Sequence, residues 1–388
     1  MAIPLSYSFH NLVARKFTAI LTAGGMALVT FVFAAVLMLA QGLERTLVDT
    51  GSPENAIVLR GSAETEVSSV IDRASADIIE VQPEVDYDAQ GNPVAAKESV
   101  VLVTLPKKGT GKPTNVVVRG VGAHSKTLRP KIRLIAGRHF RPDSREVVAG
   151  KSIAERIAGA SLGETLNFAL TDWHVVGILD SNGTAFDSEL WADSQQLMSA
   201  FRRTTYSSVI LRIPASNSFE ALKTRLENDP RLTVQVKREI AFYKEQSEVM
   251  SKFIRILGLA MTIFFSAGAI LGAMVTMYTA VASRTREIGA LRALGFKQRD
   301  ILAAFLAESL MLGFVGGGAG IVASSFLQWL TISTINWQSF SELAFGFELT
   351  PPIAGYAGAF ALIMGLLGGL LPAWRAANLK IVDALRAT

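Results

Sequence analysis

Residues 282–300, ASRTREIGALRALGFKQRD, lie between two long apolar runs. The stretch holds five basic and two acidic residues and no proline. It therefore predicts a short charged helix that is too polar to enter a bilayer. Gly295 is a suitable end for this helix, because glycine readily adopts the left-handed conformation of helix C-termini. The next helix is then expected to begin within 297–300.

Four apolar runs are long enough to cross a membrane as helices, which takes about 20 residues. They predict transmembrane helices at 17–41, 253–282, 301–330 and 349–374. A polar, domain-sized segment at 42–252 separates the first two, whereas only a short loop at 331–348 joins the last two. The chain has 388 residues, of which 50% are hydrophobic. This composition excludes a disordered protein and indicates a membrane protein with a sizeable folded domain.

Lys and Arg gather in three short segments, the N-terminal 1–16, the charged stretch 283–300 and the tail 375–388. Positively charged segments stay in the cytoplasm, so both termini of this multi-pass protein are predicted there. The domain at 42–252 and the loop at 331–348 are then outside. This topology accounts for the net charge of +5, which therefore does not indicate a nucleic-acid partner.

The N-terminal segment has apolar residues at helical spacing, Leu5, Phe9, Leu12 and Val13. It predicts an amphipathic helix lying on membrane lipid, the alternative being an ordered tail without a function. The first apolar run is longer than that of an ordinary signal peptide, and no clean cleavage site follows it before residue 41. We expect an uncleaved signal-anchor rather than a cleaved peptide.

The fold class expected from these patterns is an α+β membrane protein with four transmembrane helices and a large extracytoplasmic mixed α/β domain between helices 1 and 2. Segments 41–50 and 238–252 lack helix breakers and predict helical stalks that carry this domain. Within the domain, 129–203 is expected to form an inserted lobe. Strands are predicted at 56–59, 100–105, 115–119, 146–148, 166–170, 174–179, 208–213 and 233–237, and helices at 152–158 and 219–227. The chain has no cysteine, so the domain must be held together by its own core.

Motifs that carry enzyme chemistry are weak in this sequence. Ser161 lies in a G-x-S-x-G pattern, but a helical run precedes it and a strand follows, the reverse of a nucleophile elbow. The GTGK at 109–112 lacks the first glycine and the Ser/Thr of a phosphate-binding loop, and predicts a hairpin turn. The four histidines are scattered singly. We therefore predict no catalytic residue, no metal site and no cofactor bound by this chain.

Within the spans, Glu308 is the exceptional ionisable residue. It either pairs with an Arg of the charged stretch or of the C-terminal tail, or reaches the interface or a neighbouring helix by itself. Glycines four residues apart occur in each of the last three spans. This spacing predicts close helix packing within the chain or with a second copy. These helix-packing residues are Gly268, Gly272, Gly316, Gly320, Gly365 and Gly369.

In the charged stretch, Ile288, Leu291 and Leu294 form an apolar stripe on a short helix. Such a helix either docks in a groove on a soluble partner or lies flat on anionic lipid. The residues alone do not separate these two alternatives.

The charged stretch, followed by Glu308-Ser-Leu, resembles the signature of the FtsX-like (MacB-type) permeases of ABC transporters, the type VII or mechanotransmission class. Residues 372–386, PAWRAANLKIVDALR, resemble the family's closing P-A-x-x-A-A-x-x-x-P-x-x-A-L-R, with Ile381 in place of a common proline. In the outer segment, the residues similar to a MacB-type periplasmic core domain are VRGV at 118–121, GRHF at 137–140, VVAG at 147–150, GETL at 163–166 and VVGI at 175–178.

The resemblance implies a dimeric permease of the bacterial inner membrane, formed with a second copy or a paralogue. It would transmit motion from a separate ABC ATP-binding subunit that holds ATP and Mg²⁺. The resemblance also implies that the charged stretch is a coupling helix whose ATPase contacts are Arg286, Glu287, Ile288, Gly289, Leu291, Arg292 and Leu294. The expected function is export or extraction of a lipid, lipoprotein, peptide or drug, together with a periplasmic adaptor and an outer-membrane channel. The alternative is a non-transporting regulator of a cell-wall hydrolase or sensor.

Overall fold

The computed structural model of the chain describes residues 14–213, 216–336 and 338–381. The N-terminal amphipathic segment and the last part of the closing family motif lie outside the described residues. The rest divides into a helical unit, from residues up to 41, 252–330 and 347 onward, and a sheet domain, from 42–251 and 331–346.

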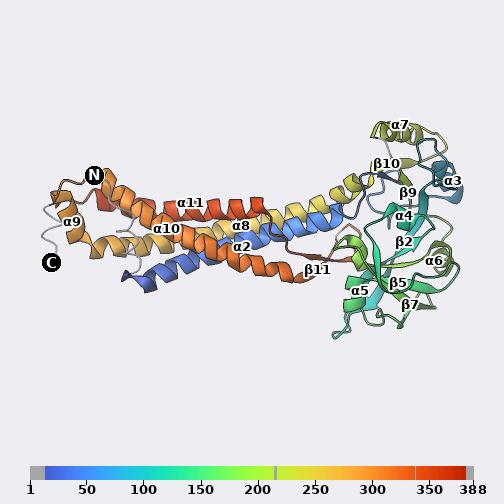
Figure 1. Cartoon of the computed structure of the whole chain (residues 1–388), viewed down its shortest axis with the longest axis horizontal. Helices are drawn as coiled ribbons and strands as arrows, with labels where there is room; N and C mark the ends of the chain where they lie inside the picture. The colour runs from blue at the N-terminus through green and yellow to red at the C-terminus, as the bar shows by residue number, and fades with distance from the viewer. Residues whose placement is uncertain (1–13, 214–215, 337, 382–388) are drawn as a thin grey trace. The chain divides into compact units, whose positions relative to one another are not determined.

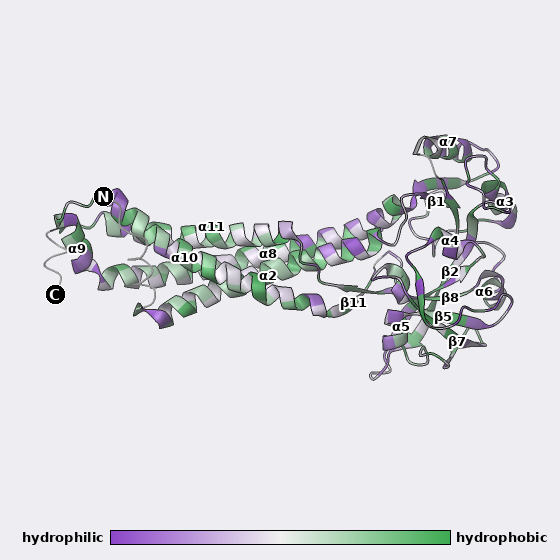
Figure 2. Cartoon of the chain, viewed as in Figure 1, coloured by the Kyte–Doolittle hydropathy of each residue, from purple (hydrophilic) through white to green (hydrophobic). Residues whose placement is uncertain are grey.

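The helical unit is built from four long apolar helices, each long and apolar enough to cross a membrane. They are α2 (Lys16–Val48), α8 (Glu239–Ser283), α10 (Gln298–Ser325, extended by the 3₁₀ turn η2, Phe326–Trp329) and α11 (Pro351–Ala377). Figures 1 and 2 show them running side by side, with mostly apolar residues along their length. The prediction of four transmembrane helices is confirmed, and the protein is a multi-pass membrane protein.

Two of these helices are longer than a membrane requires. Helix α2 has 33 residues and α8 has 45. At about 1.5 Å per residue, α8 is about 67 Å long, more than twice the hydrocarbon thickness of a bilayer. Both helices continue unbroken from the helical unit into residues of the sheet domain. The predicted helical stalks at 41–50 and 238–252 are therefore present.

The sheet domain contains ten strands in one sheet of mixed direction, which confirms the predicted mixed α/β fold. The strand order is β10-β1-β9-β2-β3-β8-β5-β7-β4, with β6 paired to β7. The pairs β3–β8 and β5–β7 are parallel and the others antiparallel. The strands are β1 (Asn55–Arg60), β2 (Ala95–Pro106), β3 (Pro113–Val121), β4 (Arg133–Gly137), β5 (Glu146–Gly150), β6 (Thr165–Phe168), β7 (Thr171–Asp180), β8 (Glu189–Asp193), β9 (Ser208–Arg212) and β10 (Val234–Arg238).

Short helices cover the sheet and complete two apolar cores. One core joins α5 and α6 to the strands β3, β5, β7 and β8 around the buried Trp173, and the other joins α3 and α7 to β1 and β9. The helices are α3 (Arg73–Glu80), α4 (Ser125–Leu128), α5 (Lys151–Arg156), α6 (Ser194–Ala200) and α7 (Ser216–Glu227), with the 3₁₀ turn η1 at Ala185–Ser188. Segment 129–203 supplies β4 to β8 at one side of the sheet, where β8 bonds directly to β3.

The loop predicted at 331–348 is an antiparallel hairpin of β11 (Thr331–Ile335) and β12 (Glu342–Gly346). It belongs to the sheet domain rather than to the helical unit. The β-branched Thr and Ile residues of β11, in the sequence TISTI, are the sequence signal of this strand, but it spans only five residues.

Candidate functional site

The charged stretch folds as helix α9 (Thr285–Ala293). Gly295 follows with a φ of +97°, the left-handed conformation expected at the end of the helix. The carboxylate of Asp300 accepts a hydrogen bond from the backbone N–H of Lys297 at 2.8 Å, which caps the start of α10. The local sequence therefore sets both ends of the turn between the two helices.

The apolar stripe of α9 is buried at one end and exposed at the other. Ile288 is 2% exposed and packs in a core that includes Ile301 and Phe305 of α10, and Leu291 is partly buried against the same core. Leu294, in contrast, is 77% exposed. The stripe thus attaches α9 to its own helical unit.

The residues expected to contact an ATPase differ in their exposure. Ile288 and Gly289 are buried within the chain, so they do not lie on a surface that a partner reaches. The exposed members of the set are Arg286, Glu287 and Leu294, while Leu291 and Arg292 are half-buried. A stripe of apolar residues in a sequence does not tell which neighbour covers it.

Arg284 and Glu308 form a buried ion pair between the start of α9 and helix α10. Nη1 of Arg284 lies 3.0 Å from Oε2 of Glu308, and both residues are under 7% exposed. Burial strengthens such a pair, because little water competes for either charge. The lone acidic residue of the spans therefore belongs to the base of the charged helix, one of the two alternatives that the sequence left open.

Glycines of α10 and α11 lie where neighbouring helices come closest. A Cβ at Gly316 or Gly320 would be 2.6 Å from a backbone carbonyl oxygen of α2. A Cβ at Gly365 would be 2.8 Å from the carbonyl oxygen of Ser309, and one at Gly369 would overlap the Ser309 side chain. These four glycines fulfil the predicted packing role within the chain.

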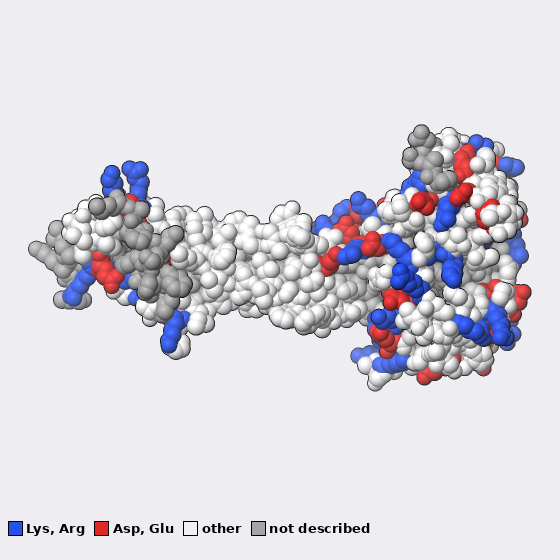
Figure 3. Space-filling view, in the orientation of Figure 1, with Lys and Arg blue, Asp and Glu red and all other residues white. Residues whose placement is uncertain are grey.

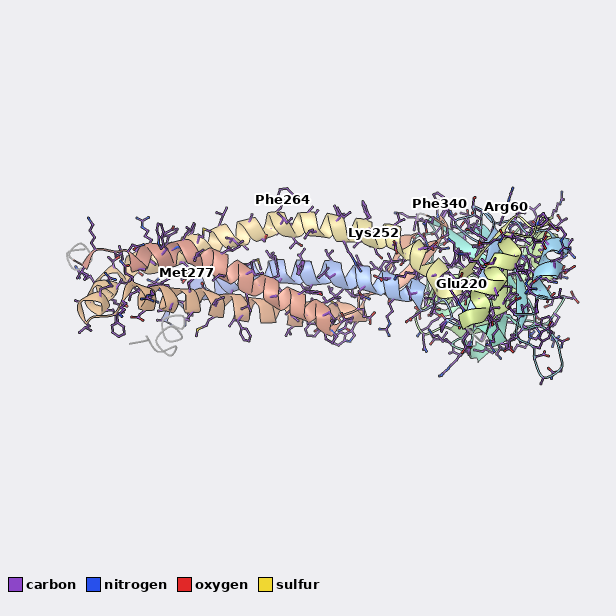
Figure 4. The ribbon with its side chains drawn as sticks, turned by 90° about the horizontal axis from the view of Figure 1, so that it is seen from above. Arg60, Glu220, Lys252, Phe264, Met277 and Phe340 are labelled. Atoms are coloured by element: carbon purple, nitrogen blue, oxygen red, sulfur yellow. The ribbon has the colours of Figure 1, made fainter. Side chains whose placement is uncertain are left out.

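The glycines of α8 differ from those of α10 and α11. A Cβ at Gly268 or Gly272 would meet no atom within 4 Å. Both line an apolar groove of about 560 Å³ between α2 and α8, whose rim includes Phe264. Phe264 is 78% exposed and points away from the other helices in Figure 4. Among the described residues, no neighbouring helix therefore packs closely against these two glycines.

A buried ion network holds the first turn of α8 in the sheet domain. It consists of Arg119, Arg129, Glu66, Glu98, Glu189 and Glu239, each under 7% exposed. Arg119 donates to Glu189 at 2.7 Å, to Glu66 at 2.8 Å and to Glu98 at 2.9 Å. Arg129 pairs with Glu98 and lies 3.6 Å from Glu239, the first residue of α8.

Protonation in this network follows from burial and from the two arginines. Burial disfavours the charged carboxylate of Glu98, but Arg129 and Arg119 outweigh it and hold its pKa at about 2. Burial raises the pKa of Glu239 above its ordinary value. The Glu239 carboxylate nevertheless accepts hydrogen bonds from the backbone N–H of Ser52 and from Asn55. The Glu239 carboxylate, at the start of α8, is thus hydrogen-bonded to the residues that follow α2.

Glu342 anchors the β11–β12 hairpin to the sheet. It is 3% exposed and lies 2.6 Å from Nη1 of Arg156 and 2.8 Å from Nζ of Lys107. Burial alone would raise the pKa of Glu342, but hydrogen bonds from Lys107, Ser333 and Thr114 lower it to about 2. In the sequence, Glu342 is recognisable only as an acidic residue in a loop that contains no Lys or Arg.

Residues weighed for enzyme chemistry lie apart from one another in the structure. Ser161 is in the turn between α5 and β6, where its hydroxyl accepts a hydrogen bond from Lys108 at 2.8 Å and its N–H donates to Glu164. The GTGK segment is the β2–β3 turn, with positive φ at Gly109 and Gly111. Within residues 14–213, 216–336 and 338–381, no three His, Asp or Glu side chains gather as metal ligands.

Charged side chains are distributed as a membrane protein requires. On the face shown in Figure 3, the middle of the helical unit carries no charge, whereas Lys and Arg side chains lie near α9. The sheet domain carries both signs over its surface. The helical unit therefore offers an uncharged band about which lipid can pack.

Two family models match the chain in adjoining parts. The MacB-like periplasmic core domain matches residues 19–229, and the C-terminal part of FtsX-like permeases matches residues 259–381. The first match alone covers more than half of the chain.

Curated relatives are ATP-binding/permease proteins. The pyoverdine export protein PvdT of Pseudomonas entomophila is 30% identical over 260 residues, which cover 61% of this chain and 37% of PvdT. The macrolide export protein MacB of Hahella chejuensis is 26% identical over 236 residues, which cover 58% of this chain and 35% of MacB. The chain thus spans less than half the length of these relatives.

Solved structures similar to the sheet domain include the periplasmic region of MacB from Actinobacillus actinomycetemcomitans. It has a TM-score of 0.38 and 12% identity, and the match covers 50% of this chain and 94% of that one. The extracellular domain of the transporter YknZ has a TM-score of 0.36 and 16% identity, covering 47% of this chain and 99% of that one. On the strength of the two family models, this chain belongs to the FtsX-like ABC transporter permeases that carry a MacB-like periplasmic core domain.

Proposed function

We propose that this chain is the membrane subunit of an ABC transporter, and that it transmits the motion of an ATPase to its sheet domain. The observation that most directly supports this proposal is that α2 and α8 continue unbroken from the helical unit into the sheet domain. There, Glu239 of α8 belongs to the buried ion network. A helix is stiff over this length, so a tilt at one end displaces the other. No substrate has to pass between the spans.

The partner ATPase docks on the exposed face of α9, in this proposal, through Arg286, Glu287 and Leu294. Helix α9 then lies in the cytoplasm of a bacterium, with both termini, and the sheet domain lies outside the inner membrane. ATP and Mg²⁺ are bound by the ATPase, and this chain itself is not catalytic. The buried pair of Arg284 and Glu308 connects α9 to α10, so that a force on α9 reaches the spans.

A second permease copy or paralogue covers the groove between α2 and α8. Gly268 and Gly272 leave the surface of α8 open there, and small residues let a helix backbone of the partner approach closely. Lipid then contacts the remaining apolar surface of the spans.

Export is favoured over regulation of a cell-wall enzyme because the relatives are named for export of pyoverdine and macrolides. The substrate is a lipid, lipoprotein, peptide or drug, delivered to a periplasmic adaptor and an outer-membrane channel. The chain's own sequence does not separate these four classes.

The test is affinity purification of the tagged chain from its native membrane, with mass spectrometry of the associated proteins. An ABC ATPase together with an adaptor protein is the expected result. The same ATPase with a cell-wall hydrolase would favour the regulator. Absence of any ATP-binding protein or domain, in a sample where the permease dimer is intact, would overturn the proposal.

A single substitution tests the proposed docking of the ATPase on the exposed face of α9. Leu294→Glu places a charge on the exposed end of the stripe, and we expect about tenfold weaker stimulation of ATP hydrolysis by the permease, the size of a single important interface contact. The matched control is Phe326→Glu, an equally drastic change at an exposed residue after α10. Unchanged stimulation by the Leu294 variant would argue against docking through this face.

A further inference from the structure

An apolar cavity of about 410 Å³ lies in the sheet domain. Side chains alternate along β5 and β8, so that Val147 and Leu190 face the core under α5 and α6, while Val148 and Trp191 face the opposite side. On that side, Val148 and Trp191, with Leu179 of β7, form the floor of the cavity. Loops and the one-turn helix α4 cover this face beside the cavity, which stays open.

The walls come from two segments that follow β3 and β4. Ile132 and Phe140 supply apolar surface, and Gly122 and Ala123 contribute no bulk. The volume falls in the range of about 300 to 1,000 Å³ that is usual for pockets of small molecules. The lining is therefore large enough and apolar enough to bury the body of a small organic ligand.

The rim carries two charged groups, Lys126 and Asp193, whose surroundings differ. Nζ of Lys126 lies 3.3 Å from Nε2 of His139, and no carboxylate in the described part of the chain lies within 4.0 Å of Nζ. Asp193 also lines the cavity, but its Oδ1 accepts the backbone N–H groups of Gln195 and Gln196 at the start of α6. Burial and the neighbouring Lys126 lower the pKa of His139, so at neutral pH the rim offers one cation, the Lys126 ammonium.

We propose that this cavity binds a small amphiphile, whose apolar body rests on Trp191, Val148 and Leu179 and whose anionic headgroup pairs with Lys126. A neutral sugar or a peptide backbone would leave its polar groups unpaired on this lining. A carboxylate, sulfonate or phosphate at one end of an apolar body satisfies both parts of the site. The site does not depend on the proposed role of the chain as a permease subunit.

The absence of cysteine in the chain makes the site accessible to a clean test. The variant Ala123→Cys places one thiol in the cavity wall, and its alkylation by a maleimide is timed in the full chain held in lipid nanodiscs, without nucleotide. Two anionic probes are added, laurate and 1-anilinonaphthalene-8-sulfonate, with dodecanol as the uncharged counterpart. The control thiol is Ser199→Cys, at an exposed position of α6 outside the cavity.

We expect at least one anionic probe to slow the alkylation of the Ala123→Cys thiol by the maleimide. Dodecanol should not slow it, and the Ser199→Cys thiol should react at an unchanged rate. Protection by laurate alone identifies a straight acyl chain such as a lipid supplies, and protection by the aromatic sulfonate alone identifies a soluble aromatic acid. No protection by either probe at millimolar concentration, or equal protection by dodecanol, would overturn the proposal.

Two further variants test the groups that recognise the ligand. Lys126→Gln should weaken protection about three- to tenfold, the loss of one charge-assisted contact at a partly exposed site, whereas Lys112→Gln in the β2–β3 turn should not change it. Gly122→Leu should remove protection by occupying the cavity, since a Cβ there meets no atom within 4 Å. The fluorescence emission of Trp191 gives a second readout in the chain without cysteine. It is obtained as the difference in emission between this chain and its Trp191→Phe variant. If the probes change neither the alkylation rate nor this emission, binding is contradicted.

Discussion

Arg284 and Glu308 illustrate how one pair of residues connects the charged helix to the membrane spans. Both are buried, and Nη1 of Arg284 lies 3.0 Å from Oε2 of Glu308. Removing one member leaves the other charge buried without its ion-pair partner, which typically costs about 3–5 kcal/mol. Replacing both by apolar residues of similar volume avoids this penalty.

We therefore expect Glu308→Leu and Arg284→Met to lower thermal stability strongly as single variants, by about 3 kcal/mol each. The double variant should regain most of the loss, while its stimulation of ATP hydrolysis remains impaired. Thermal unfolding of the chain in detergent, combined in a double-mutant cycle, measures the coupling. A double variant that is as unstable as the sum of the singles would show that the two side chains act separately.

Glu98 makes the stability of the sheet domain sensitive to acid. Its folded pKa of about 2 is below its ordinary value of 4.5, because Arg129 and Arg119 stabilise the carboxylate. The stability that this carboxylate contributes is present above pH 4.5 and is lost as the pH falls toward 2, a change of about 3 kcal/mol. Glu239, whose pKa is raised, has the opposite dependence and does not contribute to this acid-side loss.

Glu98→Gln should flatten the loss of stability between pH 4.5 and 2 and lower stability at neutral pH. Near-UV circular dichroism during thermal unfolding, recorded at several pH values, reports on the buried aromatic residues beside this network. Glu220→Gln, at the exposed position of α7 labelled in Figure 4, is the matched control and should follow the wild type. An unaltered acid profile in the Glu98 variant would mean that other carboxylates govern it.

At the scale of helices, the same sequence pattern has two different structural meanings. Gly320 lies against α2, where a Cβ would be 2.6 Å from the carbonyl oxygen of Ala27, whereas Gly272 faces the open groove beside α2. A glycine pair at a spacing of four therefore identifies a contact surface but not the helix that uses it.

These two glycines form a matched pair of variants. Gly320→Val should reduce folding yield and stability, because overpacking costs about 1–3 kcal/mol. Gly272→Val should leave the monomer stable and weaken the permease dimer, measured as the mass of the particle in nanodiscs or mild detergent. A Gly272 variant with an intact dimer would exclude this groove as the interface.

Long elements were the most predictable from the sequence, because they carry the longest signals. The apolar runs of about 25 residues determined the four helices, and Gly295 and Asp300 determined the turn after α9. The hairpin β11–β12 and the short elements α3, β4 and β8 were missed, since four to eight residues carry too little pattern. The buried ion network was not predictable either, because Arg119, Arg129 and Glu239 lie far apart in the chain and only the folded sheet brings them together.

At the scale of the whole molecule, the transmission that we propose requires the continuity of α8 between the two units. Lys252 lies where the sheet domain ends and the helical unit begins, within the uninterrupted helix. Replacing Lys252 and Phe253 by glycine weakens the helix locally by about 2 kcal/mol relative to alanine, because glycine gains the most backbone freedom when unfolded. The same two positions replaced by alanine keep the helix and remove the same side chains.

We expect the double-glycine variant to hydrolyse ATP with its partner while its sheet domain no longer responds. The chain has no cysteine, so a single introduced thiol on the sheet domain, such as Ser199→Cys, carries a spin label in each copy of the dimer, and the distance between the two labels is measured with and without ATP. The double-alanine variant should show the ATP-dependent change of the wild type, and the double-glycine variant should lose it. If both variants respond alike, force does not reach the sheet domain through α8, and α2 or the β11–β12 hairpin with its anchor Glu342 must carry it instead.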